Sequence, residues 1–292
     1  SLIDIFHLSD EQINILFSSR IPRTVSILLS GSSLALSGLI MQQMMQNKFV
    51  SPTTAGTMEW AKLGILMSLL FFPNGPILIK LLFAVVLSIV GTFLFVQLIN
   101  LIRVKDVIFV PLLGIMIGGI LSSFTTFVAL RTNALQSIGN WLTGNFAVIT
   151  SGRFEVLYLT IPLLILAFVF ANHFTIAGMG KDFSHNLGVS YEKIIKIALF
   201  ITATLTALVV VTVGTLPFLG LIVPNIISIY RGDHLKNALP HTLMLGAIFA
   251  DIIGRIIVYP YEINIGLTIG VFGTIIFLIL LMKGRKNYAN ER

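Results

Sequence analysis

Long runs of apolar residues dominate the chain, and polar residues fall mainly between them. A helix needs about 20 apolar residues to cross the ~30 Å hydrocarbon core of a bilayer. Charged residues, Pro, Gly and Asn divide the chain into nine such runs, at roughly 21–46, 54–72, 77–102, 106–130, 154–173, 193–213, 214–230, 239–260 and 264–283. The seventh run is short and contains Pro217 and Pro224. The pattern predicts an all-α, polytopic transmembrane helix bundle with nine spans.

The longest stretch without such a run is 131–153, which contains Trp141 and Phe146. Aromatic residues favour the membrane–water interface, so this stretch is predicted to be interfacial. No soluble domain interrupts the runs. The whole chain, 1–292, is therefore predicted to form a single transmembrane domain.

Composition supports a lipid environment. The chain is 56% hydrophobic and 11% charged, with a mean hydropathy of +0.96, whereas soluble domains carry about 25% charged residues. There are no cysteines. Their absence excludes a disulfide framework, a thiol nucleophile and a Cys-ligated metal.

The basic residues predict the orientation of the spans. Of the 19 Lys and Arg residues, 12 fall in alternate loops and at the C-terminal end. Placing them inside, as the positive-inside rule requires, puts the C-terminus in the cytoplasm and, with nine spans, Ser1 outside. This distribution explains the net charge of +7 without a nucleic-acid partner. The rule is broken by five outward arginines, namely Arg20, Arg23, Arg131, Arg153 and Arg255.

Motifs for catalysis are missing from the sequence. The segment 178–182, Gly-Met-Gly-Lys-Asp, lacks the spacing of a Walker A motif and its Ser/Thr, so the chain itself is not expected to hydrolyse ATP. No HExxH motif and no pair at metal-ligand spacing occurs among the five histidines, so we predict no catalytic residues and no metal site.

Two carboxylates lie within predicted spans. Glu59 has Lys62 three residues on, and Asp251 has Arg255 four residues on. Residues at these separations share a helical face, so each pair is predicted to be mutually neutralised. Ion-driven carriers use intramembrane carboxylates. A secondary carrier using Asp251 or Glu59 is therefore the alternative function.

Close helix packing is indicated at three pairs of small residues, Gly31–Ala35, Gly114–Gly118 and Gly266–Gly270. A small residue every fourth position lets the backbones of two helices approach closely.

Four blocks occur in the order typical of one transporter family. The first comprises Arg20-Ile-Pro-Arg23-Thr-Val, Ala35-Leu-Ser-Gly38-Leu-Ile-Met-Gln42, Asn47 and Pro52. The second comprises Leu187-Gly188-Val189 and Pro217-Phe-Leu-Gly220-Leu-Ile-Val-Pro224. The third comprises Gly232-Asp233-His234, Pro240, Leu245-Gly246-Ala247 and Ala250-Asp251 with Arg255, and the fourth Ile265-Gly266, Gly270, Gly273 and Phe277. Together they resemble the vitamin B12/ferric-siderophore (FecCD-like) permease family of ABC importers.

The resemblance implies a ten-span, BtuC-like permease fold with both termini in the cytoplasm, so the first family helix would lie upstream of Ser1 or be absent. It implies a bacterial plasma or inner membrane location. The implied partners are two ATP-binding cassette subunits, an extracellular or periplasmic substrate-binding protein and a second permease chain, identical or sister. ATP would bind to the partner subunits, and this chain would hold no cofactor.

Several positions depart from the family's usual pattern. Asn225 stands where His is frequent, Ser228 where Arg is frequent and Asn264 where Pro is frequent, and Lys48-Phe49-Val50 replaces Pro-Leu-Ala. The stretch from Asn47 to Gly56, with 217–225, resembles the branch that handles catecholate-type ferric siderophores.

The resemblance also implies roles for individual residues. Outward arginines at the positions of Arg20, Arg23 and Arg255 would engage glutamates of the binding protein, because arginine binds carboxylates bidentately. The loop 174–193 would be the coupling element that meets the ATPase. Its candidate residues are Gly178, Met179, Lys181, Asp182, His185, Leu187 and Gly188, with a short helix over 181–187 and Gly188 as its C-cap.

A third site is suggested by polar residues at the cytoplasmic end of the first run. Gln42, Gln43, Gln46 and Asn47 either form a gate on the substrate pathway or simply end the helix at the interface.

Overall fold

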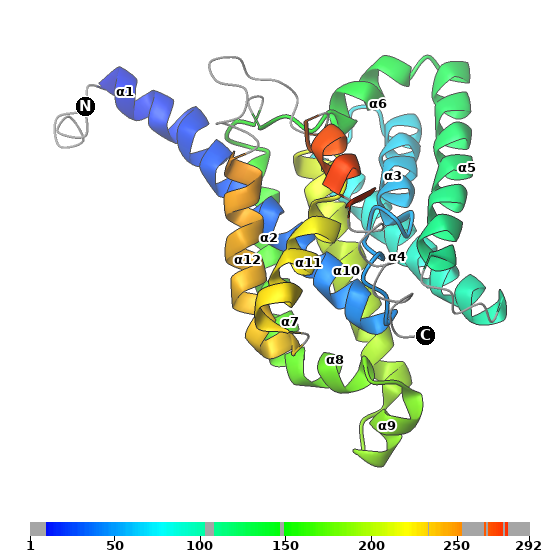
Figure 1. The fold of residues 1–292 in the computed structure, drawn as a ribbon. Helices are drawn as coiled ribbons and strands as arrows, with labels where there is room; N and C mark the ends of the chain where they lie inside the picture. The colour runs from blue at the N-terminus through cyan, green and yellow to red at the C-terminus, as the bar shows by residue number, and fades with distance from the viewer. Residues whose placement is uncertain are drawn as a thin grey trace.

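The computed structural model describes residues 10–102, 108–146, 149–232, 234–252, 266, 268–276 and 278–279. Within these ranges every regular element is helical (Figure 1). In chain order these are α1 (Asp10–Ile15), the π-helix η2 (Leu16–Arg20), α2 (Ile21–Met44), α3 (Thr57–Phe71), α4 (Ile77–Ile102), α5 (Phe109–Arg131), α6 (Leu135–Leu142), the 3-10 helix η4 (Phe154–Leu159), α7 (Thr160–Val169), α8 (Ala171–Ala177), α9 (Lys181–Asn186), α10 (Tyr191–Thr212), α11 (Leu219–Arg231) and α12 (Leu235–Asp251). Residues 268–276 are also helical.

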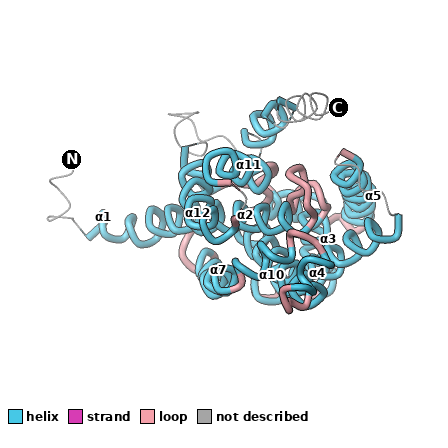
Figure 2. The backbone as a smooth tube through the Cα atoms, turned by 60° about the horizontal axis from the view of Figure 1, so that its bottom comes forward, coloured by secondary structure: helices cyan, strands magenta, loops and turns pink. Residues whose placement is uncertain are grey.

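Helix α2 is the central element. It continues α1 and η2 into one helix of 35 residues, and α10, α11 and α12 surround its second part (Figure 2). Glycines allow α2 and its neighbours to approach closely enough for backbone contact. A Cβ on Gly31 would lie 2.4 Å from the carbonyl oxygen of Gly246 in α12, so the two backbones touch. The predicted Gly31–Ala35 packing pair is thereby confirmed, since Gly246 also lies against Ala35.

The contact between α2 and α11 depends on a proline. Pro224 has no N–H to give to the carbonyl of Gly220 four residues earlier. That carbonyl oxygen lies against Gly38 of α2, where an added Cβ would lie 1.6 Å from it. A glycine at 38 and a proline at 224 thus bring these two helices into backbone contact.

The apolar runs correspond well to the described helices. The run at 77–102 coincides with α4, and four helices are long and apolar enough to cross a membrane. The run at 154–173 is bent: α7 and α8 meet at 59° and would make a fifth span together. The bend places Phe174 in the core with residues of α2 and α10, where it is fully buried. Since α3, α11 and α12 are shorter and the last two runs extend beyond the described residues, the nine-span count stays a prediction.

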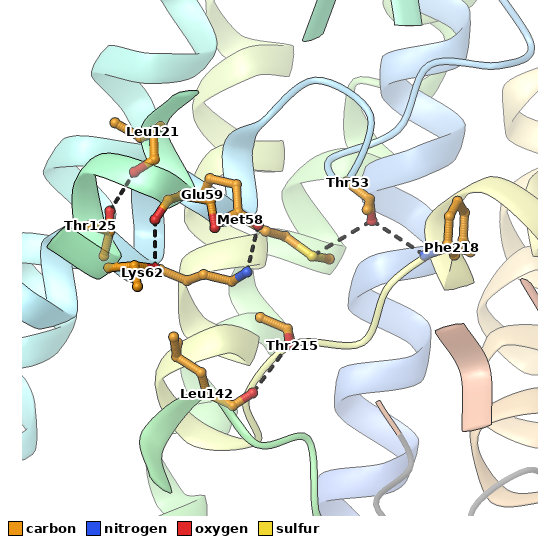
Figure 3. A network of polar contacts seen from close by, with 11 residues as sticks. Thr53, Met58, Glu59, Lys62, Leu121, Thr125, Leu142, Thr215 and Phe218 are labelled. Carbon is orange, nitrogen blue, oxygen red and sulfur yellow. Dashed lines mark hydrogen bonds and ion pairs between the residues drawn. The ribbon is translucent and has the colours of Figure 1, made fainter. Parts of the chain in front are cut away.

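Two non-helical segments meet beside α2. Residues 45–56 precede α3 and residues 213–218 precede α11. The backbone N–H of Phe218 donates to Thr53 Oγ1 at 3.4 Å, and Thr215 Oγ1 donates to the carbonyl of Leu142 at 3.2 Å (Figure 3). These bonds matter because unpaired backbone groups are costly away from water.

Helix α5 stands at the side of the bundle, packed mainly on α3 (Figure 2). The predicted pair Gly114–Gly118 faces the segment before α3 and the first turn of α3: a Cβ on Gly114 would lie 2.0 Å from the carbonyl oxygen of Thr54, and one on Gly118 would lie 3.5 Å from Glu59 Cγ. At the third predicted pair, Gly266 donates its N–H to the carbonyl of Gly144, while the closest atom to a Cβ on Gly270 would be Pro217 Cγ at 3.8 Å.

Candidate coupling and docking sites

The loop 174–193, predicted as the coupling element and called the coupling loop below, contains a short helix that projects from the end of the bundle opposite α6 (Figure 1). Gly180, with φ of 110°, starts the turn into α9, and Gly188, with φ of 71°, follows its end. The N–H of Val189 donates to the carbonyl of Ser184 and that of Gly188 to His185, which is a Schellman motif. The predicted helix with a Gly188 cap is confirmed, although it ends at Asn186 rather than Leu187.

One side of α9 is fastened to the bundle. Ser184 is buried, and its hydroxyl donates to the carbonyl of Gly180 at 2.7 Å or of Ile176 at 3.2 Å. Lys181 pairs with Glu192 of α10 at 3.3 Å. The other side is open and presents Met179, Phe183 and Leu187, together with Asp182 and His185.

The open side of α9 has the chemistry of a contact surface. Met179, Phe183 and Leu187 lie just before, within and directly after α9, and about half of each is exposed. Exposed apolar side chains rimmed by polar residues are typical of a protein interaction site. Of these residues, Phe183 was not among the sequence candidates. The signal that could have identified it was an aromatic residue within the otherwise polar segment 181–186.

The four gate candidates separate into two pairs. Gln42 and Asn47 are buried: Gln42 Nε2 donates to the carbonyl of Leu221 at 3.4 Å, and Asn47 Oδ1 accepts the N–H of Phe49 at 2.9 Å. Gln43 and Gln46 instead face the coupling loop. Gln46 Nε2 donates to the carbonyl of Gly178 at 2.8 Å, so the predicted gate and the predicted coupling element are in direct contact.

Three of the positions that depart from the family pattern contact one another. Lys48 Nζ donates to Ser228 Oγ at 2.8 Å, and Asn225 Nδ2 donates to the carbonyl of Lys48 at 2.9 Å. The residues that replace the usual Pro, Arg and His therefore form one joint contact between the segment after α2 and α11.

The docking candidates lie at the other end of the molecule. Arg20 is exposed at the end of η2, and Arg23 is half-buried one turn later in α2, so the two share a helical face. Arg255 lies outside the described residues. The arrangement of all three candidates is therefore not established.

Two other outward arginines have intramolecular partners. The guanidinium of Arg153 lies 4.1 Å from the ring centroid of Trp141, and Lys80 Nζ lies 5.3 Å from the same ring. Arg131 stacks on Phe127 at 5.5 Å. Burial lowers the pKa of Arg153 below its ordinary value, yet arginine stays protonated in proteins. Cation–π contacts thus account for Arg131 and Arg153. In the sequence, Trp141 lies between Arg131 and Arg153, and this placement was the signal that could have predicted a cation–π contact in the stretch 131–153.

The predicted ion pair within the membrane is present. Lys62 Nζ pairs with Glu59 Oε1 on the first turns of α3, close to Thr125 of α5 (Figure 3). The partner predicted for Asp251, Arg255, is outside the described residues. No group of three His, Cys, Asp or Glu in the described parts of the chain could hold a metal ion.

Helix α5 carries an exposed face that sequence reasoning missed. Gly119, Ser123 and Thr126 follow one face, and all three are exposed. Both hydroxyls donate to backbone carbonyls one turn earlier, Ser123 to Gly119 and Thr126 to Ser122. The i, i+4, i+7 spacing of small residues in an apolar helix was the available signal.

Comparisons with known proteins agree with this geometry. The sequence model of the FecCD transport family matches residues 1–283. The petrobactin import system permease protein YclN of Bacillus subtilis is 53% identical over 292 residues, which cover 99% of this chain and 92% of the relative. The ferric-anguibactin transport system permease protein FatD of Vibrio anguillarum is 38% identical over 274 residues, covering 93% and 87%.

Among solved structures, a metal-chelate type ABC transporter in an inward-facing conformation superposes with a TM-score of 0.76. The identity is 22%, and the match covers 95% of this chain and 90% of that one. At this level of identity, the similarity shows that the two chains share a fold.

Proposed function

Because this chain belongs to the FecCD transport family, we propose that it is the permease subunit of an ABC importer for a catecholate-type ferric siderophore or a similar chelate. The family resemblance drawn from the motifs is confirmed, and the chain is a multi-pass membrane transport protein rather than an enzyme. The substrate class is supported by the two relatives named for petrobactin and ferric anguibactin. The pairing of Glu59 with Lys62 does not favour an ion-coupled carrier that uses Glu59. For Asp251 the alternative stays a prediction, since Arg255 lies outside the described residues.

The observation that carries the energy-coupling part is α9. A single helical turn, fastened on one side and open on the other, suits insertion into a groove on an ATPase. Two cytoplasmic ATP-binding cassette subunits, one per permease chain, would contact α9. They would bind and hydrolyse ATP, and their closure would move α9, while this chain would bind no cofactor itself. Because the ATPase subunits are cytoplasmic, α9 and the C-terminus would lie on the cytoplasmic side.

The opposite end would receive the substrate-binding protein. Arg20 and Arg23 are placed on one face there, where carboxylates of a partner could bind them, and Arg255 is proposed to join them. A second permease chain would complete the pathway. The exposed small face of α5 suits a wide, mildly polar cavity between the two chains.

Uptake by cells tests the proposal. A strain lacking its own siderophore permeases would receive this gene together with genes for its ATPase, its binding protein and the second permease chain. We expect uptake of radio-iron from ferric petrobactin but not of cobalamin. Arg20→Glu should reduce uptake at least tenfold, because one reversed charge in a docking pair costs more than about 1.4 kcal/mol.

The matched control is Arg131→Glu, an exposed arginine on the same end whose described partner is Phe127. It should leave uptake within about twofold, since a surface charge with no partner protein contributes little. Absence of uptake for every ferric siderophore would contradict the proposed function. Equal uptake by Arg20→Glu and wild type would contradict only the docking role.

A further inference from the structure

The end of α2 is held in an uncommon backbone conformation. Gln46 has φ of 49°, in the left-handed region that usually takes glycine. The N–H of Asn47 donates to the carbonyl of Gln42 and that of Gln46 to Gln43, so α2 ends in a Schellman motif with Gln46 at the glycine position. A glutamine there is less favourable than glycine, so the backbone alone gives no reason for this side chain.

The side chain of Gln46 has a specific contact. Its Nε2 donates to the carbonyl of Gly178 at 2.8 Å, on the turn that leads into α9. The left-handed backbone directs the side chain toward this turn, 132 residues further along the chain. The strained residue is thus the one that joins α2 to the coupling loop.

Gln43 reinforces the same contact by packing. A Cβ on Gly178 would lie 2.4 Å from Gln43 Nε2 and 2.6 Å from its Cγ. The turn at 178 is therefore pressed against Gln43, and only glycine fits without displacing it. Gly180, which starts α9, also lies beside Gln46 Nε2, at 3.6 Å from an added Cβ.

Both elements joined here are held together by their own contacts. The hydroxyl and backbone bonds of Ser184 fix α9 to Gly180, so the short helix and its preceding turn are one piece. Helix α2 is buried among α10, α11 and α12 with backbone contacts at Gly31 and Gly38. A displacement of α9 would therefore reach the centre of the bundle through the side chains of Gln43 and Gln46.

We infer that Gln46, supported by Gln43, is the positioning residue that transmits movement of α9 to α2. This inference rests on the proposed function, because it assumes that an ATPase moves α9. The proposed role requires no contact of Gln46 with substrate or nucleotide. Its role is to make the turn at Gly178 and the end of α2 shift together.

The test uses the whole importer in proteoliposomes, with its ATPase and binding protein, and measures both ATP hydrolysis and uptake of radio-iron-labelled ferric petrobactin. Gln46→Gly keeps the left-handed backbone and removes only the side chain. We expect ATP hydrolysis to stay within about twofold and the iron transported per ATP to fall about fivefold, the equilibrium effect of one lost hydrogen bond. Gln97→Ala, an exposed glutamine on α4, is the control and should change neither quantity.

A second pair of variants tests the packing. Gly178→Ala should lower the iron transported per ATP because the new methyl group displaces Gln43 or the turn. Adding Gln43→Ala removes the clash and should restore the ratio, which a general loss of folding would not do.

Three results would overturn the inference: an unchanged ratio in Gln46→Gly, loss of ATPase binding in that variant, or no rescue in the double variant. Each requires that the wild-type complex transports ferric petrobactin. A wild-type complex that hydrolyses ATP but moves no ferric siderophore would instead contradict the proposed function, and the inference would fall with it.

Discussion

The most apolar windows of helices α10 and α4 have nearly the same mean hydropathy, yet they lie in different surroundings. In α10, 72% of the most apolar window is buried inside the protein, and in α4 only 28%. Small and hydroxyl residues lie on the buried side of both helices, for example Thr202 and Thr206 in α10 and Ser88 and Thr92 in α4. In α10 the buried positions also include large residues such as Leu205, whereas in α4 large residues such as Leu82 and Val86 are exposed.

The comparison shows what holds a membrane bundle together. Lipid tails are as apolar as leucine, so hydrophobicity does not drive one apolar helix against another. Close packing drives helices together instead. It is helped by small residues and by hydroxyl groups that donate a hydrogen bond to a carbonyl of their own helix. Thr206 donates to the carbonyl of Thr202, for example, and so enters the core without an unpaired hydroxyl.

Substitutions of glycine should show the largest difference in stability between a helix packed inside the bundle, such as α2, and an exposed helix face, such as that of α5. Gly38→Ala in α2 would place a Cβ 1.6 Å from the carbonyl oxygen of Gly220, so α2 and α11 would have to separate. We expect a loss of about 3 kcal/mol in the free energy of unfolding, the upper range for overpacking. The yield of folded chain in detergent and its thermal unfolding temperature measure this.

The control is Gly119→Ala in α5, where no atom lies within 4 Å of the added Cβ. Alanine is the better helix former, so this change should be neutral or slightly stabilising. Similar losses of unfolding free energy in Gly38→Ala and Gly119→Ala would mean that close approach between helices does not distinguish the buried helix α2 from the exposed face of α5.

A leucine pair should give a smaller difference. Leu205 of α10 is fully buried, and Leu82 of α4 is 61% exposed. Leu205→Ala should cost about 2 kcal/mol, the lower end for such changes, because lipid and core are similarly apolar and mainly packing is lost. Leu82→Ala should cost well below half of that. Unfolding in mixed micelles by a denaturing detergent measures both, and equal losses would contradict the assignment of α4 to lipid.

Single cysteine substitutions at exposed positions should have the smallest effect on folding. Their labelling distinguishes side chains exposed to water from side chains exposed to lipid. The 292 residues contain no cysteine, so a single introduced cysteine gives the only thiol signal from these residues. In the assembled importer, a water-soluble maleimide should label Ser123→Cys on the small face of α5, which we propose lines a wet cavity. It should leave Leu82→Cys unlabelled because lipid surrounds that position. An unlabelled Ser123→Cys would remove α5 from the pathway.

Local features were well predicted from the sequence. The apolar run at 77–102 coincides with α4, and Gly188 caps the coupling helix as its position after a short helical segment indicated. The Glu59–Lys62 pair followed from a spacing of three residues. In each case the prediction depends on residues within one or two turns of each other, where chain geometry allows few alternatives.

The remaining features depend on residues far apart in the chain. Hydropathy identified α2 and α4 alike as spans, but only the tertiary structure placed α2 at the centre, because backbone contact at Gly38 requires Gly220 from another helix. It likewise gave Arg153 a partner in Trp141 and joined Gln46 to Gly178. The sequence by itself thus determined the class of protein, the position of apolar helices such as α4, and the cap of α9. The choice of which apolar face meets protein and which meets lipid was made by shape and close approach, to which hydropathy is blind.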